Sequence, residues 1–276
     1  IRVVTPGTTL NALSLDESKN NYLMAIVSIE EHFGLAAADI TTGDCFVTEL
    51  DTPGKLMDEI NKFVPAEIIC NDAFLLRGID TADLKNRLGI CVFSLDTWYF
   101  DDETCKRSLM DHFHVSTLDG LGISDFDSAV IAAGALFQYL KETQKTNMSH
   151  MTAIRPYNAE MYMLIDSSSR RNLELVETLR EKQKRGSLLW VLDKTRTAMG
   201  ARTLRAYVEQ PLIHGDEIEE RLEALEELNA FPMLRDEMRE YLHPIYDMER
   251  LISRISYQSA NPRDMIAFAS SLEMIP

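Results

Sequence analysis

The pattern of apolar residues changes near residue 145, and this change constrains the fold more than any other feature of the sequence. Up to that point, short β-branched and apolar runs alternate with amphipathic stretches, whereas after Lys145-Thr146-Asn147 the strand-like runs nearly vanish. Short apolar runs bounded by turn residues are typical of strands. The predicted strands cover residues 22–29, 33–40, 45–50, 67–70 and 90–95.

The first three predicted strands are separated only by short turns, which favours antiparallel hairpins. Amphipathic stretches then alternate with the remaining strands. The predicted helices are one with Leu56, Ile60 and Phe63, and others over residues 81–88, 101–112 and 126–143. Three meandering strands followed by alternating helices and strands form the RNase H-like order. The sequence therefore predicts an α/β RNase H-like domain over residues 21–150, after an extended lead-in and linker over residues 1–20.

Residues 151–276 are expected to form an all-α domain. Several local signals mark its helices: a cap at Asn158 with Met161, Leu164 and Ile165 inward, a capping-box start at Asp216 and Glu219, first helical positions at Pro232 and Pro262, and an apolar period over Ile245, Met248, Ile252 and Ile255. The sequence starts as if in mid-chain, and Pro276 interrupts a helical pattern. We therefore expect a piece of a longer cytoplasmic protein, with this domain incomplete at its C-terminus.

The stretch 188–212, LLWVLDKTRTAMGARTLRAYVEQPL, is the most distinctive part of the helical half. Thr195 or Thr197 can cap a helix that Pro211 ends. Thr197, Ala201, Leu204 and Val208 share one face, which we expect to be buried. Gly200 is expected to admit a neighbouring backbone.

The same stretch has a charged face as well. Arg202, Arg205 and Glu209 follow one another at helical spacing, and we expect them to lie in solvent. On its pattern alone, the stretch indicates a core helix with a solvated flank.

The order of residue types in this stretch is more particular than a helical pattern requires. The motif residues are Asp193, Thr195, Thr197, Met199, Gly200, Arg202, Leu204 and Arg205, followed by Pro211-Leu212. This motif closely resembles the core domain of the MutS family of DNA mismatch-repair proteins. Three further stretches, 2–8, 33–43 and 246–264, resemble other parts of that family in the family's own order.

The resemblance implies the family's connector domain, followed by the first part of its core, or lever, domain. In that family the connector communicates between domains and docks the MutL partner, and the levers couple the ATPase to the DNA clamp. The sequence contains neither the family's Phe-x-Glu mismatch-reading motif nor a phosphate loop. The resemblance therefore implies that ATP and Mg²⁺ bind elsewhere in the parent protein. We expect no catalytic residue, cofactor or metal site in this chain.

The formal charge of −16 weighs against strong DNA binding by this chain alone. Residues 1–150 carry 11 Lys and Arg against 23 Asp and Glu, and residues 151–276 carry 17 against 21. A surface that neutralises phosphates would lean the other way. The expected partners are therefore mismatched DNA through the parent protein, MutL, and a second copy in a parent homodimer. No apolar run approaches the ~20 residues that span a bilayer, so no membrane partner is expected.

Two other functions remain open on the sequence. An RNase H-like fold can hold two metal ions for nuclease chemistry, and Asp39, Asp44, Asp72 and Asp96 lie in or after predicted strands. Turn aspartates explain these positions more simply, because the first strand offers no central carboxylate. His112 and His114 form a His-x-His pair without an evident third ligand.

A MutS paralogue that acts on recombination junctions is the other alternative.

The four cysteines suggest neither a disulfide nor a metal clip. Cys45, Cys70 and Cys91 lie in strand-like apolar runs, where a free thiol behaves as a small core residue, and Cys105 completes the set. We therefore expect reduced cysteines, consistent with the expected cytoplasmic location.

Overall fold

The computed structural model describes residues 3–10, 15–146 and 148–275, and the chain divides into two compact units. The sheet unit comprises Ile1–Leu15, Asn20–Ala159 and Ser256–Gln258. The helical unit comprises Asp16–Lys19, Glu160–Ile255 and Ser259–Pro276. The main division thus falls between residues 159 and 160, whereas the sequence placed it at 150. The predicted linker is not one piece, because residues 16–19 belong to the helical unit. Residues 1–2 and 11–14 of the predicted lead-in lie outside the described residues.

The sheet unit has the RNase H-like strand order that the sequence predicts. Its strands are β1 (Leu23–Ile29), β2 (His32–Asp39), β3 (Asp44–Leu50), β4 (Glu67–Cys70), β5 (Cys91–Ser94) and β6 (Arg155–Pro156). The spatial order is β5-β4-β1-β2-β3-β6, with β1, β2 and β3 antiparallel and β4 and β5 parallel to β1. The sequence missed β6, because two edge residues that include a proline give no strand pattern.

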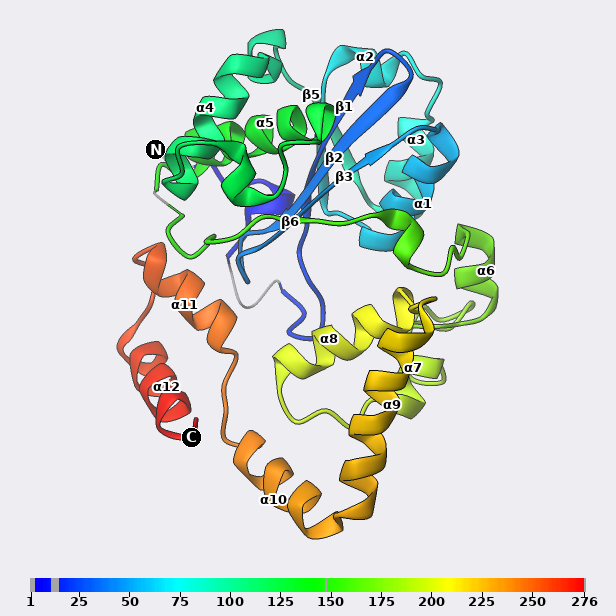
Figure 1. Ribbon diagram of the computed structural model, residues 1–276, viewed down its shortest axis with the longest axis vertical. Helices are drawn as coiled ribbons and strands as arrows, with labels where there is room; N and C mark the ends of the chain where they lie inside the picture. Colours follow the sequence, from blue (N-terminus) through cyan, green and yellow to red (C-terminus); the bar gives the residue numbers. More distant parts are fainter. Residues whose placement is uncertain (1–2, 11–14, 147, 276) are drawn as a thin grey trace. The chain divides into compact units, whose positions relative to one another are not determined.

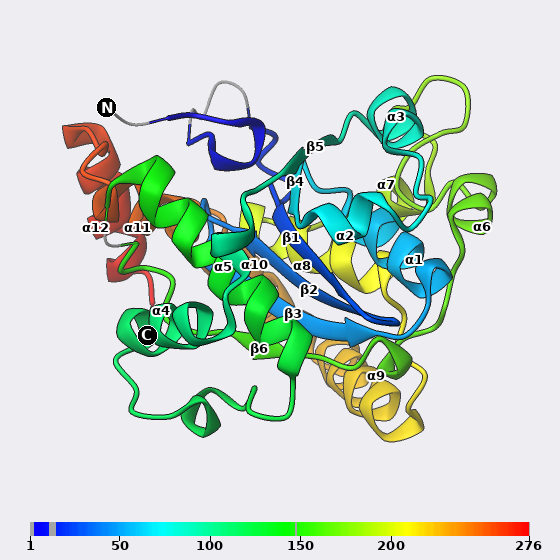
Figure 2. The same cartoon turned by 90° about the horizontal axis from the view of Figure 1, so that it is seen from above.

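Helices cover both faces of this sheet (Figure 1 and Figure 2). The helical segments of the sheet unit are η1 (Pro6–Thr8), α1 (Pro53–Phe63), α2 (Asp72–Leu75), α3 (Thr81–Asp83), the π-helical turn η3 (Leu84–Leu88), η4 (Thr97–Phe100), α4 (Asp102–Phe113), η5 (Leu118–Leu121) and α5 (Asp127–Gln144). In the view from above, α4 and α5 lie on one face, and α1, α2 and α3 lie on the other.

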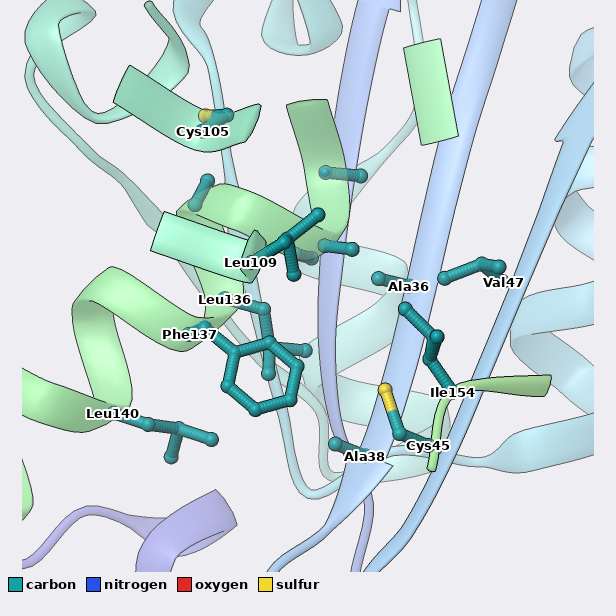
Figure 3. Close-up of a cluster of buried hydrophobic side chains, with 14 of the residues drawn as sticks. Ala36, Ala38, Cys45, Val47, Cys105, Leu109, Leu136, Phe137, Leu140 and Ile154 are labelled. Carbon is teal, nitrogen blue, oxygen red and sulfur yellow. The ribbon is translucent and has the colours of Figure 1, made fainter. Parts of the chain in front are cut away.

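Each face of the sheet has its own apolar core, because alternate strand residues point to opposite faces. Leu23, Ala25 and Val27 of β1 join the cluster with α4 and α5, whereas Met24 and Ile26 join the cluster with α1, α2 and η3. Figure 3 shows Leu136, Phe137 and Leu140 of α5 facing Ala36 and Ala38 of β2 and Cys45 and Val47 of β3. Burial on both faces explains why β1 reads as a continuous apolar run.

Two glycines let α5 pack closely against its neighbours. A Cβ added at Gly34 of β2 would lie 2.0 Å from the Ser128 carbonyl oxygen at the start of α5. A Cβ at Gly134 would lie 2.3 Å from Cys105 Cβ on α4. The helix start is capped from β3, because Glu49 Oε1 accepts bonds from Ser128 N at 2.6 Å and Ala129 N at 3.1 Å. The sequence around the start of α5 does not reveal this cap, because Glu49 is 79 residues away from Ser128.

The helical unit contains the predicted helices with several corrections. Its helices are α6 (Ser167–Asn172), α7 (Leu188–Leu192), α8 (Ala198–Glu209), α9 (Gly215–Ala230), α10 (Pro232–Leu242), α11 (Met248–Ser256, whose last residue joins the sheet unit) and α12 (Pro262–Glu273). Pro232 and Pro262 occupy first helical positions as predicted. None of the helices in the described part of the chain is both long and apolar enough to cross a bilayer.

Two local predictions for this unit are wrong. The helix expected after Asn158 is only the single turn η6 (Ala159–Met161), and Leu164 is 73 % exposed. The helix in this region is instead α6, which starts where Asp166 caps the amides of Ser168 and Ser169. Asp216 lies inside the first turn of α9 and gives it no side-chain cap. The apolar spacing after Asn158 was misleading, because the cap at Asp166 decided where the helix began.

We expect native thiol labelling to distinguish Cys91 from the other cysteines. Burial raises the pKa of Cys45, Cys70 and Cys105 to about 12, whereas Cys91 is only half-buried. Because the thiolate is the reactive form, one thiol should react with an aromatic disulfide reagent at pH 8 in the folded chain, and four should react in urea. Mass mapping identifies the labelled residue. Rapid native labelling of Cys45 would contradict the packing of β3 against α5.

Candidate functional site

The turn between α7 and α8 is built by three of the motif residues. Asp193 Oδ1 accepts bonds from Thr195 N at 3.0 Å and Thr195 Oγ1 at 2.6 Å, and Lys184 Nζ binds its other oxygen. Thr197 then caps α8 by accepting the Gly200 amide at 3.0 Å. Burial raises the pKa of Asp193, but the bonds from Lys184 and Thr195 outweigh burial and hold the pKa below 3.8. The motif thus begins as an ionised turn that leads the chain into α8.

The apolar face of α8 differs from the prediction. Leu204 and Met199 are only half-buried. A Cβ at Gly200 would meet Thr197 Oγ1 at 3.1 Å and the Thr195 side chain, with no other part of the chain nearer. The expected close approach of a neighbouring backbone at Gly200 is therefore wrong. This glycine instead leaves room for the capping hydroxyl.

Arg202 is the most buried residue of α8, which reverses the expectation of a solvated charged face. Its side chain is 5 % exposed and forms a bidentate pair with Asp247, from Nη1 to Oδ2 at 2.7 Å and from Nη2 to Oδ1 at 2.8 Å. Nη2 also donates to Glu249 Oε2 at 2.6 Å. Burial lowers the pKa of Arg202, but the two carboxylates outweigh burial and raise it. The guanidinium is therefore held as a buried cation.

A second buried arginine, Arg250 of α11, lies beside the same carboxylate. Arg250 Nε is 3.8 Å from Asp247 Oδ2. We call Arg202, Asp247, Glu249 and Arg250 the arginine cluster. Both arginines also bind carbonyls of the segment Asp16–Lys19: Arg202 Nη1 donates to Glu17 O at 2.9 Å, and Arg250 donates to Asp16 O at 3.0 Å and to Lys19 O at 2.5 Å.

The segment Asp16–Lys19 is a turn that its own side chains stabilise. Asp16 Oδ1 accepts bonds from Ser18 N at 2.9 Å and Ser18 Oγ at 2.7 Å, and Lys19 N donates to Asp16 O at 3.2 Å. Burial raises the pKa of Asp16, but the Ser18 bonds and nearby cations outweigh it and lower the pKa. The turn therefore presents its carbonyls to the arginine cluster as a formed unit.

Arg205 and Glu209 form a second partly buried pair on α8. Arg205 Nη2 lies 3.1 Å from Glu209 Oε1, and both side chains are less than a fifth exposed. Burial raises the pKa of Glu209, and the Arg205 and Arg170 cations only partly oppose this. All three members of the predicted charged face are thus buried or half-buried, because Arg202 pairs with Asp247 and Glu249 and because Arg205 and Glu209 pair with each other.

The aspartates considered for nuclease chemistry have other roles. Asp39 is fully buried and binds Asn20, Asn21 and Thr41. The other three are separate: Asp44 pairs with Arg155, Asp72 binds Ser94, and Asp96 precedes η4. Among the residues that the structure describes, no group of three or more His, Cys, Asp and Glu could hold a metal ion.

The two histidines of the predicted His-x-His pair have different structural roles. His112 Nε2 binds the Met151 carbonyl at 2.9 Å, whereas His114 ends α4 in a left-handed conformation. Each histidine thus has a local structural setting.

Sequence reasoning noted only part of this site. Asp247, Glu249 and Arg250 stand in the stretch 246–264, which carried the family resemblance but no assigned role. The sequence alone predicts that the segment Asp16–Lys19 is part of a linker. Its Asp-x-Ser spacing is a turn signal that was available in the sequence, but its arginine partners are more than 180 residues away, as the separation of 185 between Glu17 and Arg202 shows.

Two family models match the chain in succession. The model of MutS domain II matches residues 21–152, and the model of MutS domain III matches residues 168–276. The interval between the two matches contains the division between residues 159 and 160.

Curated relatives match over the whole chain. Proteins named "DNA mismatch repair protein MutS" from Lachnoclostridium phytofermentans, Ruminiclostridium cellulolyticum and Acetivibrio thermocellus are 59%, 47% and 43% identical to it. Each match covers 100% of this chain but only 30%, 32% and 32% of the respective relative. The chain therefore spans about a third of the length of the curated relatives it matches.

We expect Arg202→Ala to destabilise the helical unit more than Leu204→Ala. Removing one partner of a buried ion pair typically costs about 3–5 kcal/mol, because the remaining charge loses its partner. A half-buried leucine should cost about 1 kcal/mol, below the range for full burial. Urea unfolding followed by Trp190 fluorescence, in a Trp98→Phe background, measures both. The opposite order would mean that packing, not the arginine cluster, organises α8.

We expect the contribution of Asp193 to stability to disappear in acid. Its pKa is lowered in the folded chain, so its contribution is present above about 3.8 and is lost as the pH falls through the folded value. The difference in unfolding free energy between the parent and Asp193→Asn should shrink towards zero below pH 3.8, because a protonated aspartate resembles asparagine. Asp236→Asn, at an exposed side chain, is the control. A difference in unfolding free energy that does not change with pH would exclude a stabilising role for the ionised Asp193 carboxylate.

Proposed function

The chain belongs to the MutS family, and we propose that it is the connector and core segment of a mismatch-repair ATPase. In this proposal it couples mismatch binding to ATP hydrolysis in the whole protein and docks MutL. The observation that carries the proposal is the match to MutS domains II and III in succession, with identity to named MutS proteins along the entire chain. The role is thus one of coupling rather than catalysis.

The architecture supports a coupling role on physical grounds. Coupling between distant sites requires elements that move as units and a defined connection between them. The sheet unit has an apolar core on each face, and the arginine cluster ties α8 and α11 of the helical unit together. These are the properties that a segment between two working sites needs.

The chemistry of the chain favours a site for ATP and Mg²⁺ elsewhere in the parent protein. The sequence lacks a phosphate loop of the form G-x-x-x-x-G-K-[ST]. The net charge of −16 favours weak DNA contact by this chain alone. We propose a cytoplasmic parent that binds mismatched DNA as a homodimer, with this chain acting between its DNA-binding and ATPase parts.

A role at recombination junctions is the second candidate. The three relatives described above all carry the mismatch-repair name, which favours mismatches over junctions. The full-length protein decides between them: stimulation of its ATP turnover by a mismatched duplex supports the first, and stimulation only by a four-way junction supports the second.

We expect the purified chain to bind MutL from the same source, without hydrolysing ATP and without preferring mismatched over paired duplex. Its DNA affinity should be weak and should fall steeply with salt, because only phosphate contacts remain. Biolayer interferometry and a coupled ATPase assay measure these properties. Absence of MutL binding would remove the docking role, and metal-dependent DNA cleavage by the chain would favour the nuclease alternative.

A further inference from the structure

The chain is anchored to both units at two consecutive residues, Lys19 and Asn20. Lys19 is the last residue of the short helical-unit segment, and Asn20 returns to the sheet unit. The Lys19 carbonyl accepts the Arg250 guanidinium at 2.5 Å, and the Asn20 side chain donates to Asp39 Oδ2 at 3.0 Å. A single peptide bond joins the two anchored residues, so their α-carbons lie about 3.8 Å apart. The connection between the anchors therefore cannot lengthen.

The anchor in the helical unit is held firmly by charge. Arg202 and Arg250 are 5% and 6% exposed, and together they bind the carbonyls of Asp16, Glu17 and Lys19. A buried guanidinium that lost these acceptors would keep only its carboxylate partners, and unsatisfied buried donors are costly. The turn Asp16–Lys19 therefore follows α8 and α11 when these helices move.

The anchor in the sheet unit is equally specific. Asp39, fully buried at the end of β2, accepts bonds from Asn20 Nδ2 and, at 2.9 Å, from Asn21 N. Its other oxygen accepts Thr41 N at 2.8 Å and Thr41 Oγ1 at 2.6 Å. Asn21 Nδ2 also donates to the Pro6 carbonyl at 3.1 Å. Any displacement of Asn20 is therefore applied to the end of β2.

The crossing at residues 159 and 160 is built differently. The flanking main-chain bonds are Tyr157 N to Val47 O at 3.0 Å in the sheet unit and Met163 N to Pro211 O at 2.8 Å in the helical unit. Several residues separate these two bonds, and an extended chain of that length reaches roughly 20 Å. Another crossing, between Ile255 and Ser256, lies within α11, and the chain returns to the helical unit after Gln258. Of the crossings at Lys19–Asn20 and at residues 159 and 160, the Lys19–Asn20 bond is therefore the one suited to transmit a pull.

We propose that residues 16–21 form a taut main-chain link through which movement of α8 and α11 is transmitted to the Asp39 end of β2. Arg202, Arg250 and Asp39 are its positioning residues. This inference rests on the proposed coupling function and assigns a route to it. The arginines bind main-chain carbonyls of the link rather than its side chains. The length of the link should therefore matter more for transmission of movement than the identity of its side chains.

The direct test is to add slack to the link. Two glycines inserted between Lys19 and Asn20 leave every anchoring side chain in place. The matched control inserts two glycines after Gly78, where a Cβ would meet nothing within 4 Å. Circular dichroism and urea unfolding establish that both variants fold.

The first readout is the distance distribution between spin labels on Leu76 and Leu225, which are 86% and 62% exposed, in a Cys91→Ser background. We expect the insertion at the link to broaden the distribution, and the control insertion to leave it unchanged. Arg250→Lys should act in the same direction, because lysine lacks the fork that binds two carbonyls. Arg254→Lys, whose partner is the Asp264 side chain, is its control.

The second readout is the stimulation of ATP turnover by mismatched DNA in the full-length protein. We expect the link insertion to lower the stimulation about fivefold, the lower end of typical coupling, with basal turnover unchanged. Unchanged distances, or broadened distances with full stimulation, would overturn the transmitting role. If mismatched DNA does not stimulate ATP turnover by the unmodified full-length protein, the proposed function is wrong. The spin-label distances would still test the link in that case.

Discussion

The helical unit depends on two buried guanidiniums. In the part of this unit that the structure describes, the buried hydrophobic residues are Leu175, Leu189 and Leu251, and Arg202 and Arg250 are buried to a similar degree. A buried charge is tolerated only where its partners are in place. The arginine cluster therefore determines how α8, α11 and the segment Asp16–Lys19 lie relative to one another.

The sheet unit is organised by packing instead. Apolar side chains fill both faces of β1 and β2, and Gly34 and Gly134 allow α5 to come closer than any side chain would permit. Close-packed interiors deform little. Lys19 is held in the unit organised by charge, and Asn20 is held in the packed unit. This arrangement is consistent with the coupling role that we propose.

The sequence predicted local features well where the cause was local. Strands β1, β2 and β4 agree with prediction because their apolar runs are buried on both faces. Thr197 caps α8 because a cap needs only the amides of its own helix. The helix expected after Asn158 failed because its apolar spacing had no core to face, as exposed Leu164 shows. The burial of Arg202 was missed because its partner Asp247 lies 45 residues away.

The family, the RNase H-like strand order and the helical character of the second half were thus determined by the sequence alone, since periodicity and motif order are properties of neighbouring residues. Only the tertiary structure decided which charges are buried, that Asp39 anchors a chain crossing, and that residues 16–19 belong to the helical unit. Each of these depends on the free energy of placing a polar group beside a partner distant in sequence. The local pattern of residues along the chain does not identify that partner.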